Sequence, residues 1–517
     1  MILGAGVMQG PAIRMAAAMG LETVVVDGNR DAPCAGEADI FEHIDLKDRE
    51  GIAALALRLK AEHGGRGLSG VMTAGTDFSA TVAWAAERAG LPGIPYEAAL
   101  NASDKSRMRR CFSAAGVPSP RFIVIDGKNF CGALLKLPFS YPVVVKPVDN
   151  MGGRGCKRAD GEEELRAACA EALSFSRSYR AIVEEYMDGP EYSVDAIVSG
   201  DSITVCGLAD RHIYFPPYFI EMGHTMPALL DSAAAEALLE TFKAGVRSLG
   251  LTLGAAKGDI KLTSKGPMVG EIAARLSGGY MSGWTYPYSS GAEPVKAAIL
   301  AALGRPLGEK PQGLERTRDW VSAERAFISI PGLVTAIKIT KSAENNKYLK
   351  NIFFRAGERE RVNFPINNVT KCGSVISAAP ERASAVEAAE EAARGILIRL
   401  APHDAETDAF LSAPAGERDF PPDAFNVPSI DAEAAFMPRG KPDLKRCEAA
   451  IRPFPELLES GARDYSGRGV GECLDAVRAV TGLPLPLDNA GTLGREFWQA
   501  LIRGSYQGAA YVVDSLQ

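Results

Sequence analysis

Apolar and polar positions alternate regularly over residues 1 to about 95. The apolar stretch MILGAG precedes a helical pattern, ETVVVD precedes a helix near residues 51–63, and GVMTAG precedes another helix. Short apolar strands separated by amphipathic helices are typical of parallel α/β units. We therefore expect a parallel α/β domain over residues 1–98.

The pattern changes after residue 98. A helix capped by Ser103 or Asp104 leads into strands, a glycine-rich loop and further strands up to about residue 304. Residues 321–400 combine strands with an Ala/Glu-rich helix from Ala383, which predicts an α+β domain. We therefore divide the rest of the chain at residues 99–310, 311–400 and 401–517.

The last segment, residues 401–517, has a composition of its own. Residues 403–443 are rich in Pro, Asp and Ala with little periodicity, which predicts a wrapping segment or a linker. The final stretch has helical periodicity and offers Phe497, Leu501, Tyr506 and Tyr511 for packing. We expect a mostly helical extension that docks on the core or forms a homodimer contact. The sequence gives it no chemistry.

The composition is that of a soluble globular enzyme. The 517 residues exceed one ordinary core, and 46% of them are hydrophobic and 23% charged. No apolar run is long enough for a membrane helix, and a net charge of −7 without a basic block argues against nucleic acid as a partner. Nine cysteines without a CxxC pair and five scattered histidines exclude the usual zinc spacings. The start of the chain lacks a basic region and breaks early at glycines, unlike a signal peptide, so we expect a cytoplasmic protein.

The first glycine turn imitates a dinucleotide-binding fingerprint. Gly4, Gly6 and the acidic Asp27 fit the pattern G-x-G-x-x-G with a ribose-binding acid. Gln9, however, stands where the third glycine is required, and Gly10 comes one place late. An incomplete fingerprint is weak, so we favour a structural α/β domain with a tight first turn over an NAD site.

A strand lysine precedes a glycine-rich loop in VVVKPVDNMGGRGCKRA, residues 143–159. A P-loop needs Gly-Lys followed by Ser or Thr, and a protein kinase places its glycine loop before the strand lysine, so both are excluded. Lys146 can hold its ammonium over nucleotide phosphates, and the glycines let backbone N–H groups approach them closely. Cys156, inside this loop, is better explained as a small neutral filler than as a nucleophile.

Four motifs in this order resemble the ATP-grasp superfamily: DKSRMR at 104–109, VVVKPVDNMGGRG at 143–155, VEEYMDGPEYSV at 183–194 and GDIKLTSKGPMVGEIAARLSGG at 258–279. The resemblance covers about residues 1–400. It implies an α/β protein with an ATP-grasp fold: an N-terminal Rossmann-like domain, an ATP-grasp domain at 99–310 with a mobile glycine-loop lid at about 118–190, and a mixed α+β C-terminal domain.

The resemblance also implies where ATP binds. Lys105 would be a second nucleotide lysine, Glu184 would receive the adenine amino group, and backbone groups near Tyr186 would read the ring edge. Glu191 would hold the ribose hydroxyls, a role that suits an ionised acceptor. Glu185 is included from the same strand, although a solvent-facing position is favoured for it. The complete set is Lys105, Lys146, Gly152, Gly153, Arg154, Gly155, Glu184, Glu185, Tyr186 and Glu191.

The stretch GDIKLTSKGPMVGE predicts two opposed carboxylates. If Ser264, Lys265 and Gly266 form a three-residue hairpin loop, Asp259 lies directly opposite Glu271. Opposed residues have Cβ atoms about 4.5–5.5 Å apart, so two carboxylates would repel unless a cation lay between them. Oxygen-only ligands beside a nucleotide imply Mg²⁺, with Mn²⁺ as an alternative and a second ion sharing Glu271 as an option. A slipped register would instead turn one acid to solvent.

ATP-grasp chemistry implies that a carboxylate is activated as an acyl phosphate, which an amine, thiol or other nucleophile then attacks. Arg275, four residues after Glu271, suits a carboxylate or the transferring phosphoryl group, and we expect catalytic roles for both. The family's common Glu-x-Asn-Pro-Arg reads Glu271-Ile-Ala-Ala-Arg275 here. Ala273 thus replaces an asparagine that often joins the metal shell, which leaves one or two metal ions open.

Two further stretches look like the branch of L-amino-acid (dipeptide) ligases: YFIEMGHTMPALL together with EIAARLSGG, and the region 323–400. The expected reaction then joins a small carboxylate, such as an amino acid, to an amine. His224 would contact substrate, Gly278 and Gly279 would form a close-approach turn, and Trp284 would be an aromatic pocket wall. A buried structural role is an open alternative for His224 and for Trp284.

Two other functions stay open from the sequence. GAGVMQG and DGNRDAPC are close to the N-terminal domain of ATP-dependent carboxylases that resemble biotin carboxylase or aminoimidazole ribonucleotide carboxylase. In such an enzyme, as in carbamoyl-phosphate synthases, bicarbonate is the carboxylate that is phosphorylated. The missing asparagine and the extension at 401–517 also fit a non-catalytic ATP-binding regulatory protein.

Overall fold

The computed structural model describes residues 1–62, 67–127, 130, 137–307, 311–413, 420–425, 461–483 and 494–516. These residues form two compact units. Unit 1 comprises residues 1–213, 223–323 and 378–382, and unit 2 comprises residues 214–222, 324–377 and 383–517. No helix in the described ranges is long and apolar enough to cross a membrane. The four domain boundaries drawn from the sequence stay predictions.

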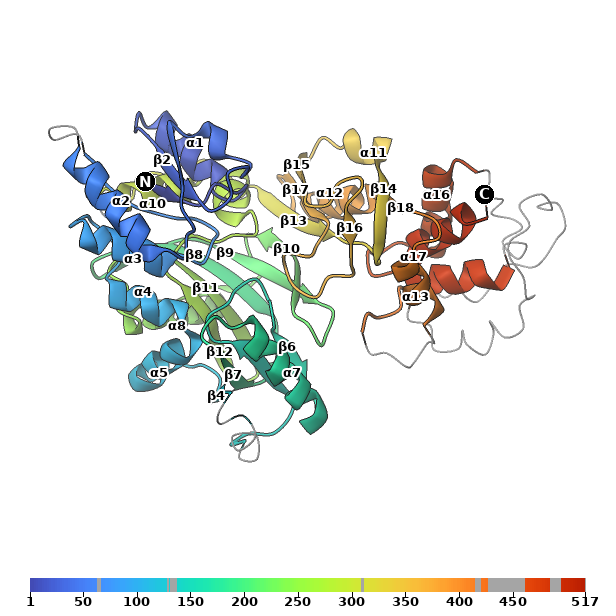
Figure 1. The fold of residues 1–517 in the computed structure, drawn as a ribbon, viewed down its shortest axis with the longest axis horizontal. Coiled ribbons are helices and arrows are strands. Elements are labelled where there is room, and N and C mark those ends of the chain that lie inside the picture. The colour runs from blue at the N-terminus through green and yellow to red at the C-terminus, as the bar shows by residue number, and fades with distance from the viewer. Residues whose placement is uncertain are drawn as a thin grey trace. The chain divides into compact units, whose positions relative to one another are not determined.

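Unit 1 begins with a three-stranded parallel sheet (Figure 1). Its strands are β1 (Ile2–Leu3), β2 (Val24–Asp27) and β3 (Ile40–His43), and its helical elements are α1 (Gly10–Ala18), η1 (Ala35–Glu37), α2 (Arg49–Ala61), α3 (Ser79–Arg88) and α4 (Tyr96–Ser103). The predicted α/β pattern is therefore present. The strand expected at GVMTAG is reduced to isolated bridges, Ile2 with Met72 and Ala74 with Leu276.

An antiparallel sheet of four strands holds the lysine and the glycine loop. Its order is β4 (Phe122–Asp126), β7 (Arg180–Glu185), β5 (Val143–Pro147) and β6 (Lys157–Ala159). Helix α7 (Glu162–Phe175) buries Leu165, Ala168 and Leu173 in the same hydrophobic core as Val143 and Val145. Within the lid predicted at about 118–190, residues 128–129 and 131–136 lie outside the described residues.

The central sheet of unit 1 separates an apolar face from a polar one. Its order is β12 (Gly266–Ala273), β11 (Leu253–Thr263), β8 (Glu191–Ser199), β9 (Ser202–Tyr214) and β10 (Ile220–Met226). Helix α8 (Ser232–Ser248) covers the apolar face (Figure 1). Phe242 of this helix packs there with Ile260 and Ile272. Unit 1 also contains α5 (Lys105–Ala115), η2 (Met281–Thr285), α9 (Tyr286–Ser290) and α10 (Pro294–Ala302).

Unit 2 combines strands with a helical C-terminal part (Figure 1). Strands β13 (Val321–Phe327), β17 (Gly373–Ala379) and β15 (Leu349–Phe354) are neighbours in one sheet. A separate three-stranded sheet has the order β16 (Arg361–Val362), β14 (Gly332–Ile339) and β18 (Ile396–Leu400). The helices of unit 2 are α11 (Lys341–Glu344), α12 (Arg382–Gly395), α13 (Ala405–Ser412), α16 (Val470–Thr481) and α17 (Gly494–Asp514). The expected α+β region and helical extension are confirmed, whereas most of the predicted linker, residues 414–419 and 426–443, lies outside the described residues.

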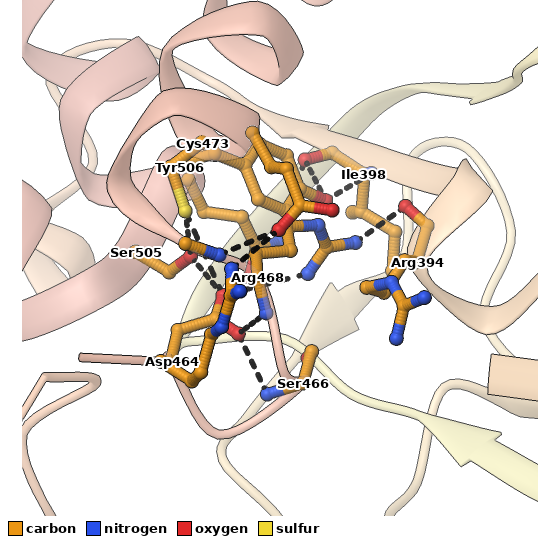
Figure 2. Close-up of polar contacts among 12 residues, drawn as sticks. Arg394, Ile398, Asp464, Ser466, Arg468, Cys473, Ser505 and Tyr506 are labelled. Carbon is orange, nitrogen blue, oxygen red and sulfur yellow. Dashed lines mark hydrogen bonds and ion pairs between the residues drawn. The ribbon is translucent and has the colours of Figure 1, made fainter. Parts of the chain in front are cut away.

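Helix α17 carries the packing residues predicted for the tail. Phe497 and Leu501 are fully buried, and Tyr506 and Tyr511 are each 4% exposed. The helix is broken at Gly504 and Ser505, and Ser505 has φ 56° and ψ −152°, a conformation that strains a residue with a side chain. Ser505 Oγ donates a hydrogen bond to the buried carboxylate of Asp464, and Figure 2 shows both residues in a polar cluster with Arg468 and Cys473. The cluster ties the helix break to the loop before α16.

Candidate functional site

Neighbouring strands of the central sheet carry a polar face, which we call the site face. Lys261 pairs with Glu191, Asp259 with Ser193, and Lys257 with Asp195. Arg211 lies opposite Glu191 on the next strand, and Glu271 and Ala273 lie opposite Asp259 and Lys257 on the other side. Because residues two apart on a strand point to the same face, these side chains form one surface. The site face consists of Glu191, Ser193, Asp195, Arg211, Lys257, Asp259, Lys261, Glu271 and Ala273.

Asp259 and Glu271 are directly opposed, but not through the hairpin loop predicted from the sequence. Thr263 pairs with Gly266, so the loop has two residues and not three. A two-residue loop alone would place Asp259 opposite Gly270. The register then shifts after Ile260, where Gly270 is the extra residue of a bulge, and the shift restores the pairing of Asp259 with Glu271. The predicted loop was wrong, and the bulge compensates for it.

Asp259 is contacted by one hydroxyl donor and by two cationic side chains. Ser193 Oγ donates to Asp259 Oδ1 at 2.8 Å, Lys257 Nζ contacts Oδ2, and Arg211 Nη1 lies 3.2 Å from Oδ2. Burial by itself would raise the pKa of Asp259, but Arg211 and Lys257 outweigh burial and lower the pKa to about 2. The carboxylate is therefore ionised at neutral pH.

Glu271 faces a lysine that a helix terminus holds in place. Lys105 is the first residue of α5, whose N-cap Asp104 accepts hydrogen bonds from the N–H groups of Ser106 and Arg107. Lys105 Nζ donates to Asn150 O at 2.7 Å and lies 3.6 Å from Glu271 Oε1. Burial would raise the pKa of Glu271, but Lys105 and Lys257 lower it below its usual range. The predicted second nucleotide lysine thus lies beside the predicted metal carboxylate.

The carboxylate pair fits a hard divalent cation. Both side chains offer ionised oxygens, which Mg²⁺ prefers over nitrogen or sulfur. Over the described ranges, no group of three or more His, Cys, Asp and Glu side chains is placed to hold a metal on its own. Asp259 and Glu271 would therefore hold the ion together with phosphate oxygens and water, which is how Mg²⁺ commonly sits beside a nucleotide.

Lys146 and Glu184 form a buried ion pair. Lys146 Nζ lies 2.8 Å from Glu184 Oε2, and Arg109 Nε lies 2.7 Å from Glu184 Oε1. Burial would raise the pKa of Glu184, but Arg109 and Lys146 lower it to about 2. Glu184 is 1% exposed and both of its oxygens have cationic partners. The structure therefore places it as the anchor of Lys146, whereas the resemblance had implied a contact with adenine.

The glycine loop has the backbone that the sequence pattern requires. Gly152, Gly153 and Gly155 have φ of 69°, 75° and 65°, where a side chain would be strained. Arg154 Nη1 donates to Asn150 Oδ1 at 3.1 Å, in the loop that also accepts from Lys105. Burial raises the pKa of the Cys156 thiol to about 11, which keeps it neutral and supports its interpretation as a filler.

Three candidate nucleotide-binding residues of the motif at 183–194, namely Glu185, Tyr186 and Glu191, have different surroundings. Glu185 forms ion pairs with Arg121 and Lys265, both largely exposed, while its own side chain is 20% exposed, so the solvent-facing position favoured for it stays a prediction. Lys261 Nζ lies 5.5 Å from the centre of the Tyr186 ring. Glu191 contacts Arg211 on the site face. Tyr186 and Glu191 therefore both lie beside Lys261, at one end of the site face.

Arg275 acts electrostatically on an acid, Asp77, that the sequence pattern did not reveal. Its Nη1 donates to Leu276 O at 3.0 Å, and its buried Nε has no hydrogen-bond partner among the described residues. Asp77, in the loop before α3, interacts electrostatically with Arg275, Lys105 and Glu271; burial raises its pKa although both cations oppose the rise. The stretch TAGTDFS has no motif that marks Asp77, because its position depends on a contact with a distant part of the chain.

That contact joins two glycines. Gly75 N donates to Leu276 O at 3.3 Å, and Gly75 has φ 64°. A Cβ on Gly75 would lie 2.8 Å from Met8 Cβ and 3.4 Å from Gly278 Cα, so only glycine fits. Gly278 is in ordinary van der Waals contact with Gly75, in the loop that carries Asp77, and its predicted close-approach turn at a substrate stays a prediction. Gly279 has φ 58°, as expected of a tight turn.

The remaining substrate candidates lie in unit 1. His224, on β10, is 2% exposed. Trp284, in η2, packs its ring against Tyr280 with centroids 5.6 Å apart. Their predicted substrate contacts stay predictions.

The first glycine turn is filled by the chain itself. Gly6 N donates to Gln9 Oε1 at 3.0 Å, and Gln9 Nε2 contacts Ala74 O. Ala5 N donates to Asp27 Oδ2 at 2.8 Å, so the acid is engaged within the turn. A pyrophosphate would meet the Gln9 side chain, which supports the structural interpretation of this domain.

The similarity of the chain to known proteins agrees with this site. A model of the ATP-grasp domain matches residues 139–283. This chain contains an ATP-grasp domain. A second model, L-amino acid ligase C-terminal domain 2, matches residues 326–401. These matches confirm the resemblance to ATP-grasp ligases and to the L-amino-acid ligase branch.

Several known ligases are similar in sequence to part of this chain. Alanine–anticapsin ligase of Bacillus subtilis is 30% identical over 237 residues, 41% of this chain and 49% of that protein. D-alanine–D-alanine ligase of Pseudomonas entomophila is 26% identical over 168 residues, 31% of this chain and 52% of that protein. The chain thus spans about half the length of these relatives. The crystal structure of L-amino acid ligase from Bacillus licheniformis has a TM-score of 0.66 and 20% identity, covering 77% of this chain and 98% of that one, which confirms the ATP-grasp fold.

Proposed function

We propose that this chain is an ATP-dependent carboxylate–amine ligase that activates an amino acid as an acyl phosphate and joins it to an amine. The observation that carries the proposal is the site face, where two opposed carboxylates lie among fixed cations beside Arg275 and Asp77. Bound Mg²⁺ would neutralise phosphate charge and orient the γ-phosphoryl group.

The lysines and the glycine loop would position the triphosphate. Lys105 and Lys146 come from different elements and direct their ammonium groups toward Glu271 and Glu184. Both lysines can then contact phosphate oxygens as point charges while the loop at residues 152–155 donates backbone N–H groups. Glu191 and Tyr186 would lie at the nucleoside end.

The chemistry needs no nucleophile from the protein. An oxygen of the substrate carboxylate attacks the γ-phosphorus, the bond to the bridging oxygen breaks, and ADP leaves. The amine nitrogen then attacks the acyl carbon, phosphate leaves, and the nitrogen loses a proton. Arg275 would stabilise the negative charge that develops on the transferring group, because a guanidinium donates in a planar, bidentate manner.

Asp77 favours an amino acid over bicarbonate. An amino acid carries an ammonium group close to its carboxylate, and Asp77 and Arg275, which interact electrostatically, are side chains of opposite charge. Bicarbonate has no ammonium group for Asp77 to accept from. Homodimerisation through residues 401–517 and a cytoplasmic location stay predictions.

Phosphate release by the purified protein with ATP and Mg²⁺ tests the proposal. The screen would cover amino acids, singly and in pairs, small carboxylates without an amino group, and bicarbonate. We expect release that depends on an amino acid together with an amine, and a peptide or amide product by mass spectrometry. Release that depends on bicarbonate alone would identify a carboxylase, and the absence of any turnover with intact ATP binding would support the regulatory protein.

A further inference from the structure

Lys257 occupies an unusual position on the site face. It lies directly opposite Ala273 on one neighbouring strand and opposite Asp195 on the other. Asp259 lies two residues further along the same strand, so Lys257 is the next side chain on the site face after the carboxylate pair. A cation is therefore placed immediately beside Asp259 and Glu271.

The ammonium of Lys257 is directed at the carboxylate pair. Lys257 Nζ contacts Asp259 Oδ2, and its charge also acts on Glu271. Two-metal phosphoryl-transfer sites place their ions about 3.5–4 Å apart, bridged by shared oxygens. A side-chain ammonium in contact with one of these oxygens supplies positive charge at a comparable distance.

The surroundings of Lys257 offer little to a second metal ion. Ala273, which faces Lys257, has no oxygen donor in its side chain and is 5% exposed. Asp195 Oδ1 accepts from Ser277 N at 2.8 Å, and Asp195 N donates to Tyr286 Oη at 3.1 Å, so Asp195 is fixed behind Lys257. Asp195 Oδ2 is buried without a hydrogen-bond partner among the described residues. The methyl group of Ala273 supplies no oxygen ligand to a second ion, and the ammonium of Lys257 already supplies positive charge beside Asp195 and Asp259.

We propose that the ammonium of Lys257 replaces a second metal ion, so that this site works with a single divalent cation. The inference rests on the proposed function, because the carboxylate pair must bind a metal–nucleotide complex. Lys257 and a single ion held by Asp259 and Glu271 would then together neutralise the phosphate charge.

Binding of Mn²⁺, counted by electron paramagnetic resonance with a non-hydrolysable ATP analogue, tests this directly. The full chain should bind a single Mn²⁺ ion. The double variant Lys257→Met with Ala273→Asn removes the ammonium and adds an amide oxygen opposite it, and should bind a second ion. Lys257→Met alone should weaken binding of the analogue about tenfold at a fixed Mn²⁺ concentration, because a charge-assisted contact is lost.

Lys243→Met is the matched control. Lys243 lies on α8, where its Nζ is 2.7 Å from Glu240 on the surface, so this variant also removes one positive charge from unit 1. It should leave both the Mn²⁺ count and the affinity unchanged. Thermal unfolding of every variant would confirm that it is folded.

The outcomes separate the inference from the function on which it rests. Two Mn²⁺ ions bound by the unaltered chain would overturn the inference and leave the ligase proposal intact. A single ion in both the unaltered chain and the double variant would show that Lys257 is not what excludes the second. Mn²⁺ binding that does not respond to the ATP analogue would refute the metal–nucleotide site itself, and with it the proposed function.

Discussion

Asp259 in unit 1 and Asp464 in unit 2 are both buried carboxylates with an arginine partner, yet their surroundings differ. Asp464 Oδ1 accepts from the backbone N–H groups of Ser466 and Arg468, each at 2.8 Å. Its Oδ2 accepts from Ser505 Oγ and Cys473 Sγ, and Arg468 Nη1 lies 3.5 Å away (Figure 2). Asp464 is therefore saturated by groups that the fold holds in place.

Asp259 has one fixed donor, Ser193, and otherwise the ends of two long cationic side chains. Glu271 lies opposite it, and buried polar atoms of Asp195, Arg275 and Ser277 nearby have no hydrogen-bond partner among the described residues. Buried polar groups without partners are unfavourable for stability and are common where a ligand completes the set. The comparison indicates that Asp464 supports the fold. Asp259, whose two cationic partners are long and flexible side chains, could exchange them for a bound ligand.

Glu271→Gln should show the largest difference between an effect on activity and an effect on stability. If Glu271 is a metal ligand, as we propose, its loss should lower kcat by roughly a thousandfold, equivalent to about 4 kcal/mol of transition-state stabilisation. The free energy of unfolding should change little, because a like charge opposite Asp259 is removed as well. Steady-state kinetics and urea denaturation measure the two effects, and Glu240→Gln on α8 is the control. Full activity in Glu271→Gln would contradict the assigned metal site.

Asp464→Asn should give the opposite result. Removing the charge leaves Arg468 and the donors from Ser505 and Cys473 poorly matched in a buried place, which should destabilise unit 2 by about 3 kcal/mol. Activity per folded molecule should stay near that of the unaltered protein. Asp475→Asn, at an exposed pair with Arg478, should change stability by less than about 0.5 kcal/mol. Equal stability of both variants would mean that the cluster does not support the fold.

Asp77→Asn tests the substrate side of the comparison. An amide cannot balance the charge of a substrate ammonium, so KM for the amino acid should rise about tenfold, equivalent to about 1.4 kcal/mol. KM for ATP should be unaffected. Asp201→Asn, at the exposed turn between β8 and β9, provides a neutral control. If the two KM values rise together, Asp77 acts on the site in general and not on the ammonium.

Lowering the pH should reduce the free energy of unfolding gradually, and by less per pH unit than Asp464→Asn does, because it protonates two ion-paired carboxylates of unit 1. The folded pKa values of Glu184 and Asp259 are lowered to about 2 from ordinary values of 4.5 and 3.8. Their stabilisation is therefore complete above about pH 5 and is lost as pH falls toward 2, with a slope of at most about 1.4 kcal/mol per pH unit for each group. Urea midpoints measured from pH 6 to pH 3 should fall less steeply in Glu184→Gln than in the unaltered chain. Parallel profiles would refute the lowered pKa of Glu184.

The order of the motifs was sufficient to predict the fold, because each motif reports a local geometry. The lysine at the end of β5, the positive-φ glycines and the Asp104 cap all depend on neighbours close in sequence. The opposed carboxylates were predicted with the wrong loop, since neither the two-residue turn nor the bulge at Gly270 has a distinctive signal in the sequence.

Contacts between distant segments explain what the sequence did not reveal. The resemblance implies a nucleotide contact for Glu184, but it does not reveal the ion pairs with Arg109 and Lys146, because these lie on a helix and a strand that are separate in the chain. Asp77 was missed because the contact between Gly75 and Gly278 spans two hundred residues of sequence. In both cases the decisive partner is set by tertiary packing.

The side chain of Gln9 has a consequence for ligand selectivity. Its amide lies inside the turn that dinucleotide-binding enzymes leave open for a pyrophosphate, and its Nε2 joins that turn to Ala74, in the loop that carries Asp77. An NAD-mimetic inhibitor designed for dehydrogenases would meet a filled space here. Inhibitors of this protein would therefore be directed at the site face. Such inhibitors would not need to bind the first glycine turn, which is the feature that this chain shares with dehydrogenases.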